Sequence, residues 1–245
     1  MSACTPQQSR VSAPLFGLFC LGSYLLSLSY GSTFLLSLLI GSRGGNEHDA
    51  GTVISTAMLS TFVAVIGSGH LSDRLGAARS VAVFGCLLAV ASLGFALTPG
   101  VGPGLLFFGL TLGLGWGVFY TLGPIIVAML VEPAQRARYF ALLSGSMMTG
   151  IGSGPLLGRL ASALGYPLTS AFLIAAGASL LGVLIFWRLG GRLRQQANHL
   201  GTAAASITWA GTAQVLSSRA VWPILMVGLG GCVFGGLSSF QTSYG

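Results

Sequence analysis

The chain has 245 residues, of which 53% are hydrophobic and 6% are charged, and eleven arginines against four acidic residues give it a formal net charge of +7. Soluble globular domains carry about 25% charged residues, so this composition excludes that class and indicates a membrane protein with several spans. Spans built from strands would need shorter segments of alternating polarity, so we expect an all-α protein.

Seven apolar windows follow one another along the chain, and none of them contains an acidic residue or a lysine. Each has the roughly 18 to 20 residues that a helix needs to cross a bilayer. The windows are residues 14–40, 52–69, 80–97, 105–130, 139–160, 168–187 and 221–244. The first follows Arg10, but its core exceeds the roughly 7 to 15 residues of a cleaved signal peptide, so we expect a first membrane helix.

The windows divide the chain into three parts. We expect residues 1–189 to form an N-terminal bundle of six transmembrane helices. The stretch 190–220 is polar and contains arginine and glutamine, which predicts a central cytoplasmic linker. Residues 221–245 are expected to form a seventh helix, the first of a second bundle that is truncated.

The arginines predict the orientation, because cytoplasmic links carry the excess of positive charge. Nine of the eleven precede the first helix or follow the second, fourth and sixth helices, whereas Arg43 and Arg159 fall on the other side. We therefore expect a multi-pass protein of the plasma or inner membrane with a cytoplasmic N-terminus. The nine are Arg10, Arg74, Arg79, Arg136, Arg138, Arg188, Arg192, Arg194 and Arg219.

The positive charge does not predict a nucleic-acid partner, because the arginines are spread over four links without interleaved aromatic residues. The cysteines show no paired spacing and the histidines lie in or beside separate links, so we expect no metal site and no cofactor. These residues are Cys4, Cys20, Cys86, Cys232, His48, His70 and His199.

An internal similarity relates the second and fifth windows. The sequence IGSGHLSDRLGAARS begins at Ile66 and IGSGPLLGRLASALG begins at Ile151, and eight of fifteen aligned positions are identical. A chance similarity between two glycine-rich segments is the alternative. The second and fifth helices hold the same place in two groups of three, and because three is odd the copies end on opposite membrane faces. We therefore predict two inverted three-helix repeats, a plan that many secondary transporters use.

The stretch GHLSDRLGAAR between the second and third helices resembles the corresponding link of the major facilitator superfamily, whose pattern is roughly Gly-x-Leu-x-Asp-Arg-x-Gly followed by basic residues. The matching residues are Gly69, Leu71, Asp73, Arg74 and Gly76, and Arg79 alone keeps a charge at the basic positions. The resemblance covers the whole chain and implies an incomplete major facilitator fold, the first half and seventh helix of a twelve-helix protein. One bundle cannot form both walls of an alternating-access cavity, so we expect no transport by this chain alone.

Two further stretches resemble patterns of this superfamily. In the fifth helix, GIGSGPLLG matches an antiporter pattern at Gly150, Gly154, Pro155 and Gly158. In the fourth helix, GLTLGLGWG matches the glycines of a third pattern, but Gly109 replaces its arginine, which puts arginine-assisted proton coupling in doubt. Plain packing through small residues is the alternative for most of these glycines. Pro155 lacks an amide donor and predicts a kink.

The resemblance implies that the link around Asp73 acts as a gate. Gly69 and Gly76 permit a tight turn. A carboxylate here can pair with a guanidinium or accept hydrogen bonds from helix N-terminal amides, and the family closes this contact against the second bundle in the outward-facing state. The alternative is that Asp73 only caps the third helix and that Arg74 only enforces the orientation.

Candidate substrate contacts are polar or aromatic residues of the first, fourth and seventh helices, which the family places around its central cavity. They are Ser27, Tyr30, Trp116, Tyr120 and Gln241. The alternative is that the serine bonds its own helix and that the aromatic residues only pack. No acidic residue, the usual proton relay, lies within a window, so groups for a coupling proton or ion reside in the other half or the coupling differs.

These observations predict a secondary active transporter that moves a small organic solute across the lipid bilayer by alternating access, with an efflux permease as one form of it. No enzyme activity is expected. An intramembrane serine hydrolase using Ser153 is one alternative, although its candidate histidine, His70, lies towards the opposite membrane face. A membrane scaffold that does not transport is the other.

Overall fold

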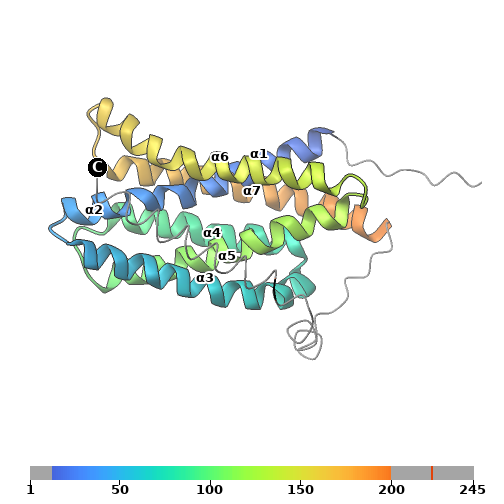
Figure 1. Cartoon of the computed structure of the whole chain (residues 1–245), viewed down its shortest axis with the longest axis horizontal. Coiled ribbons are helices and arrows are strands. Elements are labelled where there is room, and N and C mark those ends of the chain that lie inside the picture. The colour runs from blue at the N-terminus through green and yellow to red at the C-terminus, as the bar shows by residue number, and fades with distance from the viewer. Residues whose placement is uncertain (1–12, 200–221, 223–245) are drawn as a thin grey trace, which may run out of the picture.

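The computed structural model describes residues 13–199 and residue 222, and this part is built from helices joined by short links (Figure 1). Within these residues, six helical segments are long and apolar enough to cross a membrane. They are Pro14–Ser42, Glu47–Leu75, Ala77–Leu97, Pro103–Leu130, Arg136–Ala163 and Thr169–Arg192. The six windows of the predicted N-terminal bundle are therefore confirmed as helices. The predicted seventh helix lies outside the described residues except for Trp222, as does most of the linker.

The first span is divided into α1 (Ala13–Gly31), a 3₁₀ turn η1 (Ser32–Leu35) and α2 (Leu36–Ser42), where the sequence predicted one uninterrupted helix. The break follows Gly31 and coincides with two side-chain bonds to the preceding turn. Ser32 Oγ donates to the carbonyl of Ser29 at 2.6 Å, and Thr33 Oγ1 donates to that of Tyr30 at 2.8 Å. Such bonds compete with the helical backbone ladder and bend helices.

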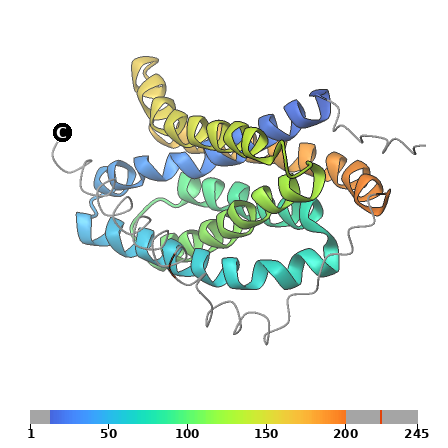
Figure 2. The same cartoon turned by 45° about the vertical axis from the view of Figure 1, so that its right-hand side comes forward.

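The other five spans are the continuous helices α3 (Glu47–Leu75), α4 (Ala77–Leu97), α5 (Pro103–Leu130), α6 (Arg136–Ala163) and α7 (Thr169–His199). A reciprocal capping box starts α3: the Asn46 side chain accepts from the Asp49 amide at 3.0 Å, and the Asp49 carboxylate accepts from the Asn46 amide at 2.9 Å. Helix α5 starts at Pro103, where a missing amide costs nothing. Figure 2 shows that the C-terminal part of α6 bends away from the bundle.

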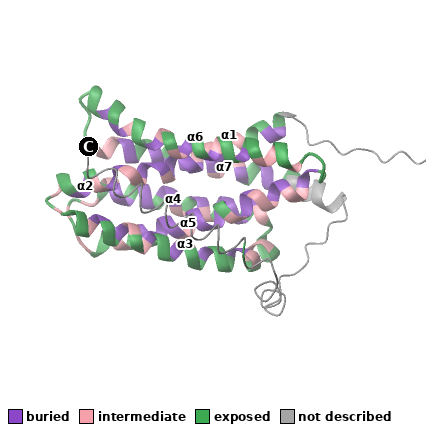
Figure 3. Cartoon of the chain, viewed as in Figure 1, coloured by how far each residue is buried: buried purple, intermediate pink, exposed green. Residues whose placement is uncertain are grey.

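The packing of the helices confirms the inverted repeat. Helix α3 packs along α5 as α6 packs along α1, and α4 packs against α5 as α7 packs against α1. Helices α4 and α7 pack against each other. Exchanging the first three spans for the last three therefore reproduces the same contacts, which is the pattern of a pseudo-two-fold axis. Figure 3 shows the buried residues gathered where the helices face one another.

The register of the repeat differs from the sequence alignment. The buried residues of α3 from Val53 to Ser68 have the same spacing as those of α6 from Leu143 to Gly158. They are Val53, Ala57, Ser60, Ala64 and Ser68 in α3, and Leu143, Met147, Gly150, Gly154 and Gly158 in α6. Ala64 thus corresponds to Gly154, whereas the alignment paired Gly69 with Gly154 and is wrong by five residues. The sequence alignment matched the glycines that the two segments share, whereas the structural register is set by the residues that each helix buries.

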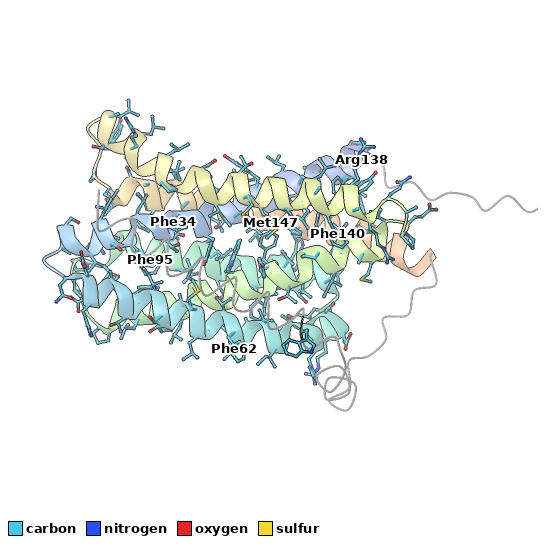
Figure 4. All side chains as sticks on the ribbon, viewed as in Figure 1. Phe34, Phe62, Phe95, Arg138, Phe140 and Met147 are labelled. Atoms are coloured by element: carbon cyan, nitrogen blue, oxygen red, sulfur yellow. The ribbon has the colours of Figure 1, made fainter. Side chains whose placement is uncertain are left out.

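Apart from Arg43 and Arg159, the described arginines lie in or next to the ends of α3, α5 and α7 and the starts of α4 and α6. These helix termini meet at one end of the bundle (Figure 1). Figure 4 shows Arg138 at this end, directed away from the helices. Arg43 lies at the other end, where its Nη2 donates to the carbonyls of Phe95 at 2.7 Å and Ala96 at 3.3 Å. A cation there stabilises the C-terminus of α4, and desolvation lowers the pKa of the Arg43 guanidinium.

Candidate functional site: an aromatic cluster between the repeats

Three aromatic side chains meet between α1 and α5. Tyr30 and Trp116 are stacked, with ring centroids 4.0 Å apart and planes inclined by 9°. Tyr120, one turn further along α5, lies 5.9 Å from Trp116 at an angle of 37°. Phe119 contacts the same indole from within the core, with a centroid separation of 5.6 Å. Tyr30, Trp116 and Tyr120 are hereafter called the aromatic cluster.

Tyr30 and Trp116 hold equivalent places in the two repeats. A Cβ on Gly117 would lie 2.7 Å from the carbonyl oxygen of Thr61 and 2.8 Å from the Cβ of Ala64, both on α3. Gly31 makes the matching approach on α6, because its Cβ would collide with the backbone of Ile151. The residues before these two glycines are Tyr30 and Trp116, so the stack lies where the two repeats meet.

The exposure of the cluster increases from Trp116 to Tyr120. The Trp116 side chain is 6% exposed, Tyr30 is half-buried and Tyr120 is 48% exposed. Three of the five predicted substrate residues are thus brought together. Ser27 is fully buried beside Gly150 of α6, and its hydroxyl has no hydrogen-bond partner among the described residues. Gln241 lies outside the described residues.

The middle of every described span lacks charge. The charged residues of the described part lie at or near helix ends or in links, and the stretches 14–42, 52–72, 80–130, 139–158 and 160–187 contain none. The polar groups within these stretches are neutral, such as the Tyr24 hydroxyl, which donates to Ser153 Oγ at 3.4 Å across the α1–α6 contact. Any recognition by this wall of the protein therefore uses rings, hydroxyls and backbone rather than ion pairs.

The predicted gating link forms the turn between α3 and α4. Gly76 adopts φ 84° and ψ 144°, a conformation that is essentially restricted to glycine. Ser80 Oγ lies 3.1 Å from the carbonyl oxygen of Leu71 and 3.0 Å from that of Gly76, which ties the two helices together. Arg79, in the first turn of α4, packs beside α7, since a Cβ on Gly190 would lie 3.1 Å from its side chain. Gly69 lies within α3. The predicted tight turn is thus made by Gly76 alone.

Asp73 and Arg74 are exposed in the last turn of α3. The interpretation of Asp73 as the cap of the following helix is wrong, because Gly76 is the N-cap of α4 and no side chain caps that helix. A carboxylate at a helix C-terminus opposes the helix dipole, which costs roughly 0.3 to 1 kcal/mol. No hydrogen bond or ion pair within the described part compensates Asp73. Its presence here is therefore not explained by the stability of α3.

We expect the Gly76→Ala variant to be less stable by about 1 to 3 kcal/mol, because alanine is strained at this positive φ. The matched control is Gly67→Ala, on the exposed side of α3, where a Cβ meets nothing within 4 Å. The thermal unfolding temperature of the two purified variants in detergent checks this difference. Equal unfolding temperatures would show that the turn relaxes around alanine.

The predicted helix-5 motif lies where α6 crosses α1. Gly150, Gly154 and Gly158 are buried against α1 and its continuation, and Gly154 lies against the backbone of Gly31. Pro155 has no amide to donate to the carbonyl of Ile151, four residues earlier, and Gly31 lies against that same carbonyl. Figure 4 shows Met147 on the side of α6 that faces α5. Sequence reasoning missed Gly31, although the proline marks the unpaired carbonyl in the sequence.

The serine-hydrolase alternative depended on Ser153. Its Oγ donates to the carbonyl of Thr149 at 2.7 Å, and Tyr24 Oη lies 3.4 Å away. Neither group is a general base of the kind that activates a serine. The Ser153 hydroxyl is therefore bonded to its own helix, as serines within helices commonly are, and the contacts of Ser153 do not support the hydrolase alternative.

Comparison with known proteins identifies the family. A sequence profile of the Major Facilitator Superfamily matches residues 15–245. The chain belongs to this superfamily. The fold of its described part is that of a partial major facilitator protein, which agrees with a crystal structure of the peptide transporter POT in complex with sulfate. That structure is 23% identical, gives a TM-score of 0.65 and matches 90% of this chain and 47% of the solved chain.

Curated members of the superfamily resemble parts of the chain. The peptide transporter YePEPT of Yersinia enterocolitica is 30% identical over 159 residues, which cover 59% of this chain and 31% of the relative. The anhydromuropeptide permease of Escherichia coli K12 is 27% identical over 174 residues, 67% of this chain and 35% of the permease. The multidrug resistance protein MdtH of Citrobacter koseri is 40% identical over 96 residues, 38% of this chain and 23% of MdtH. The matches span about a third or less of these relatives.

Proposed function

We propose that this chain forms the first half of a secondary active transporter that moves a small organic solute by alternating access. Residues 1–189 form the first bundle, 190–220 the cytoplasmic linker, and 221–245 the first helix of the second bundle. The observation that carries the proposal is the aromatic cluster, which lies at the junction of two inverted repeats and leaves Tyr120 48% exposed on a helix that is otherwise largely buried. Membership of the superfamily supports it.

We further propose a place and a direction for this activity. The end of the bundle that carries most of the described arginines faces the cytoplasm, since cytoplasmic links are enriched in basic residues. On this proposal the protein lies in a plasma or inner membrane with its N-terminus on the cytoplasmic side. Export is the direction that the antiporter-like residues Gly150 to Gly158 support. The central parts of the described spans hold no acidic residue, so either the groups that bind a coupling proton or ion lie in the second half or the coupling differs.

Cysteine labelling tests whether the aromatic cluster borders a water-accessible cavity. Single cysteines replace Tyr30, Trp116, Tyr120 or Gln241 in the whole transporter, in a background without the native cysteines. We expect a small polar thiol reagent to modify the cysteine at Tyr120 at least about ten-fold faster than one at Leu180, because a thiol in an apolar environment does not readily ionise.

Leu180 is the matched control because its exposed fraction of 51% is similar to the 48% of Tyr120. It lies on a different helix, in an apolar stretch of α7. Solutes that bind in the cavity should slow the reaction at Tyr120 and leave that at Leu180 unchanged. If the cysteines at Tyr30, Trp116, Tyr120 and Gln241 were all inert while the one at Leu180 reacted, the proposed cavity would be refuted.

A further inference from the structure

The aromatic cluster presents rings to a ligand in a fixed arrangement. Trp116 is buried and backs Tyr30 at 4.0 Å, so the Tyr30 ring is held in one orientation. Tyr120 stands one turn away with almost half of its surface free. A flat ring that enters from the exposed side therefore meets the free surface of Tyr120 and the exposed part of the half-buried Tyr30, both of which contact Trp116.

The electrostatics of this wall favour a cation over an anion. The faces of aromatic rings carry negative potential, and phenolic oxygens accept hydrogen bonds. No arginine or lysine lies within the central parts of the described spans, so an anionic solute finds no cation there. No acidic residue lies there either, so a compact ammonium group would be desolvated without a counter-charge. A charge delocalised over a large ring loses the least hydration.

We propose that the aromatic cluster binds solutes that carry a flat, delocalised aromatic cation, by stacking on Tyr30 and Tyr120. This inference rests on the proposed transport function and specifies its substrate class. The cluster supplies stacking and cation–π attraction, which contribute about 0.5 to 2 kcal/mol per contact. It supplies no ion pair, so the shape and polarizability of the ring decide which solutes bind.

The test measures binding of ethidium, a flat aromatic cation, to the purified whole transporter in detergent by fluorescence anisotropy. Replacing Tyr120 by leucine should weaken binding by about two- to thirty-fold, which is the loss of one cation–π contact. Tyr120→Phe should retain the affinity, because it keeps the ring. Phe107→Leu is the matched control, since Phe107 is an aromatic residue of the same helix that is 60% exposed and lies away from the cluster.

Ligand analogues test the charge and the ring separately. A neutral phenanthridine of the same ring size should bind several-fold more weakly than ethidium, and tetrapropylammonium should not compete with it. The proposal would be overturned if ethidium bound equally well to Tyr120→Leu and to the unmodified protein. It would also be overturned if Phe107→Leu lost as much affinity as Tyr120→Leu, because the signal would then report partition of ethidium into detergent. Equal affinity for the neutral ring would also overturn it.

The two proposals fail in different ways. If the cysteine at Tyr120 is water-accessible but ethidium binding does not depend on Tyr120, the cavity stands and the substrate class is wrong. If that cysteine is inert in the labelling experiment, the cavity itself is wrong. Tyr120 is exposed, so its leucine variant is expected to fold; thermal unfolding of each variant checks this.

Discussion

Replacing Gly154 by leucine is expected to destabilise the bundle by about 3 kcal/mol or more, since it inserts a side chain where two backbones touch. A Cβ at this position collides with the backbone of Gly31, which cannot rotate away as a flexible side chain would. Helices that associate in lipid depend on such close approach, because no hydrophobic effect drives them together. The fraction of protein that remains monodisperse after a heat step in detergent measures the loss.

The control for this substitution lies two residues earlier. Gly152 is exposed on the same helix, and a Cβ there meets nothing within 4 Å. Gly152→Leu adds the same side chain to α6 without touching α1, so it should unfold at the temperature of the unmodified protein. If the two leucine variants are equally stable, the contact between α1 and α6 is not tight in the membrane, and Gly31 has no role in it.

Replacing Asp73 by asparagine is expected to shift the transporter towards its inward-open state by about five- to 150-fold, which corresponds to about 1 to 3 kcal/mol. The proposal behind this is that Asp73 makes a charge-assisted contact with the second bundle when the cytoplasmic side is closed. The structure supports it in one respect: Asp73 is exposed and caps neither helix of the turn. Asparagine keeps the size and removes the charge.

Three measurements on Asp73→Asn check this expectation. The amount of inserted protein should be unchanged because acidic residues contribute little to topology, whereas transport should fall and cysteines on the cytoplasmic side should become more reactive. Arg79→Ala should act in the same direction but less. Glu132→Gln is the control, because Glu132 is an exposed acid in the link between α5 and α6 at the same end of the bundle. Unchanged transport in Asp73→Asn would rule out the gate.

Composition and periodicity were sufficient to predict the six spans, because a helix needs a long apolar stretch to cross a bilayer and each stretch is visible in the sequence. The need for glycine at position 76 was also visible, since the link is too short to avoid a tight turn. These features are local. Each depends on residues that are neighbours in the chain, and their physical requirements are read without knowing the rest of the fold.

The contacts between helices were not accessible in the same way. Stacking of Tyr30 on Trp116 depends on the relative rotation of α1 and α5, which is set by the small residues Gly31 and Gly117 against two other helices. The sequence placed both aromatic residues on the right helices but said nothing of their distance. The break after Gly31 was missed for a related reason: it arises from hydroxyl bonds and from the proximity of α6, neither of which lowers the apolar character of the span.

The most direct test of alternating access is to label the cysteine at Tyr120 from each side of the membrane in turn. The whole transporter is prepared in right-side-out and in inside-out vesicles. A polar reagent that does not cross the bilayer then reaches only the outer side of each kind of vesicle. We expect this one position to react from both sides, and Asp73→Asn to raise the rate from the cytoplasmic side while lowering it from the other. A cysteine that reacts from one side only, in both the unmodified transporter and Asp73→Asn, would contradict the account.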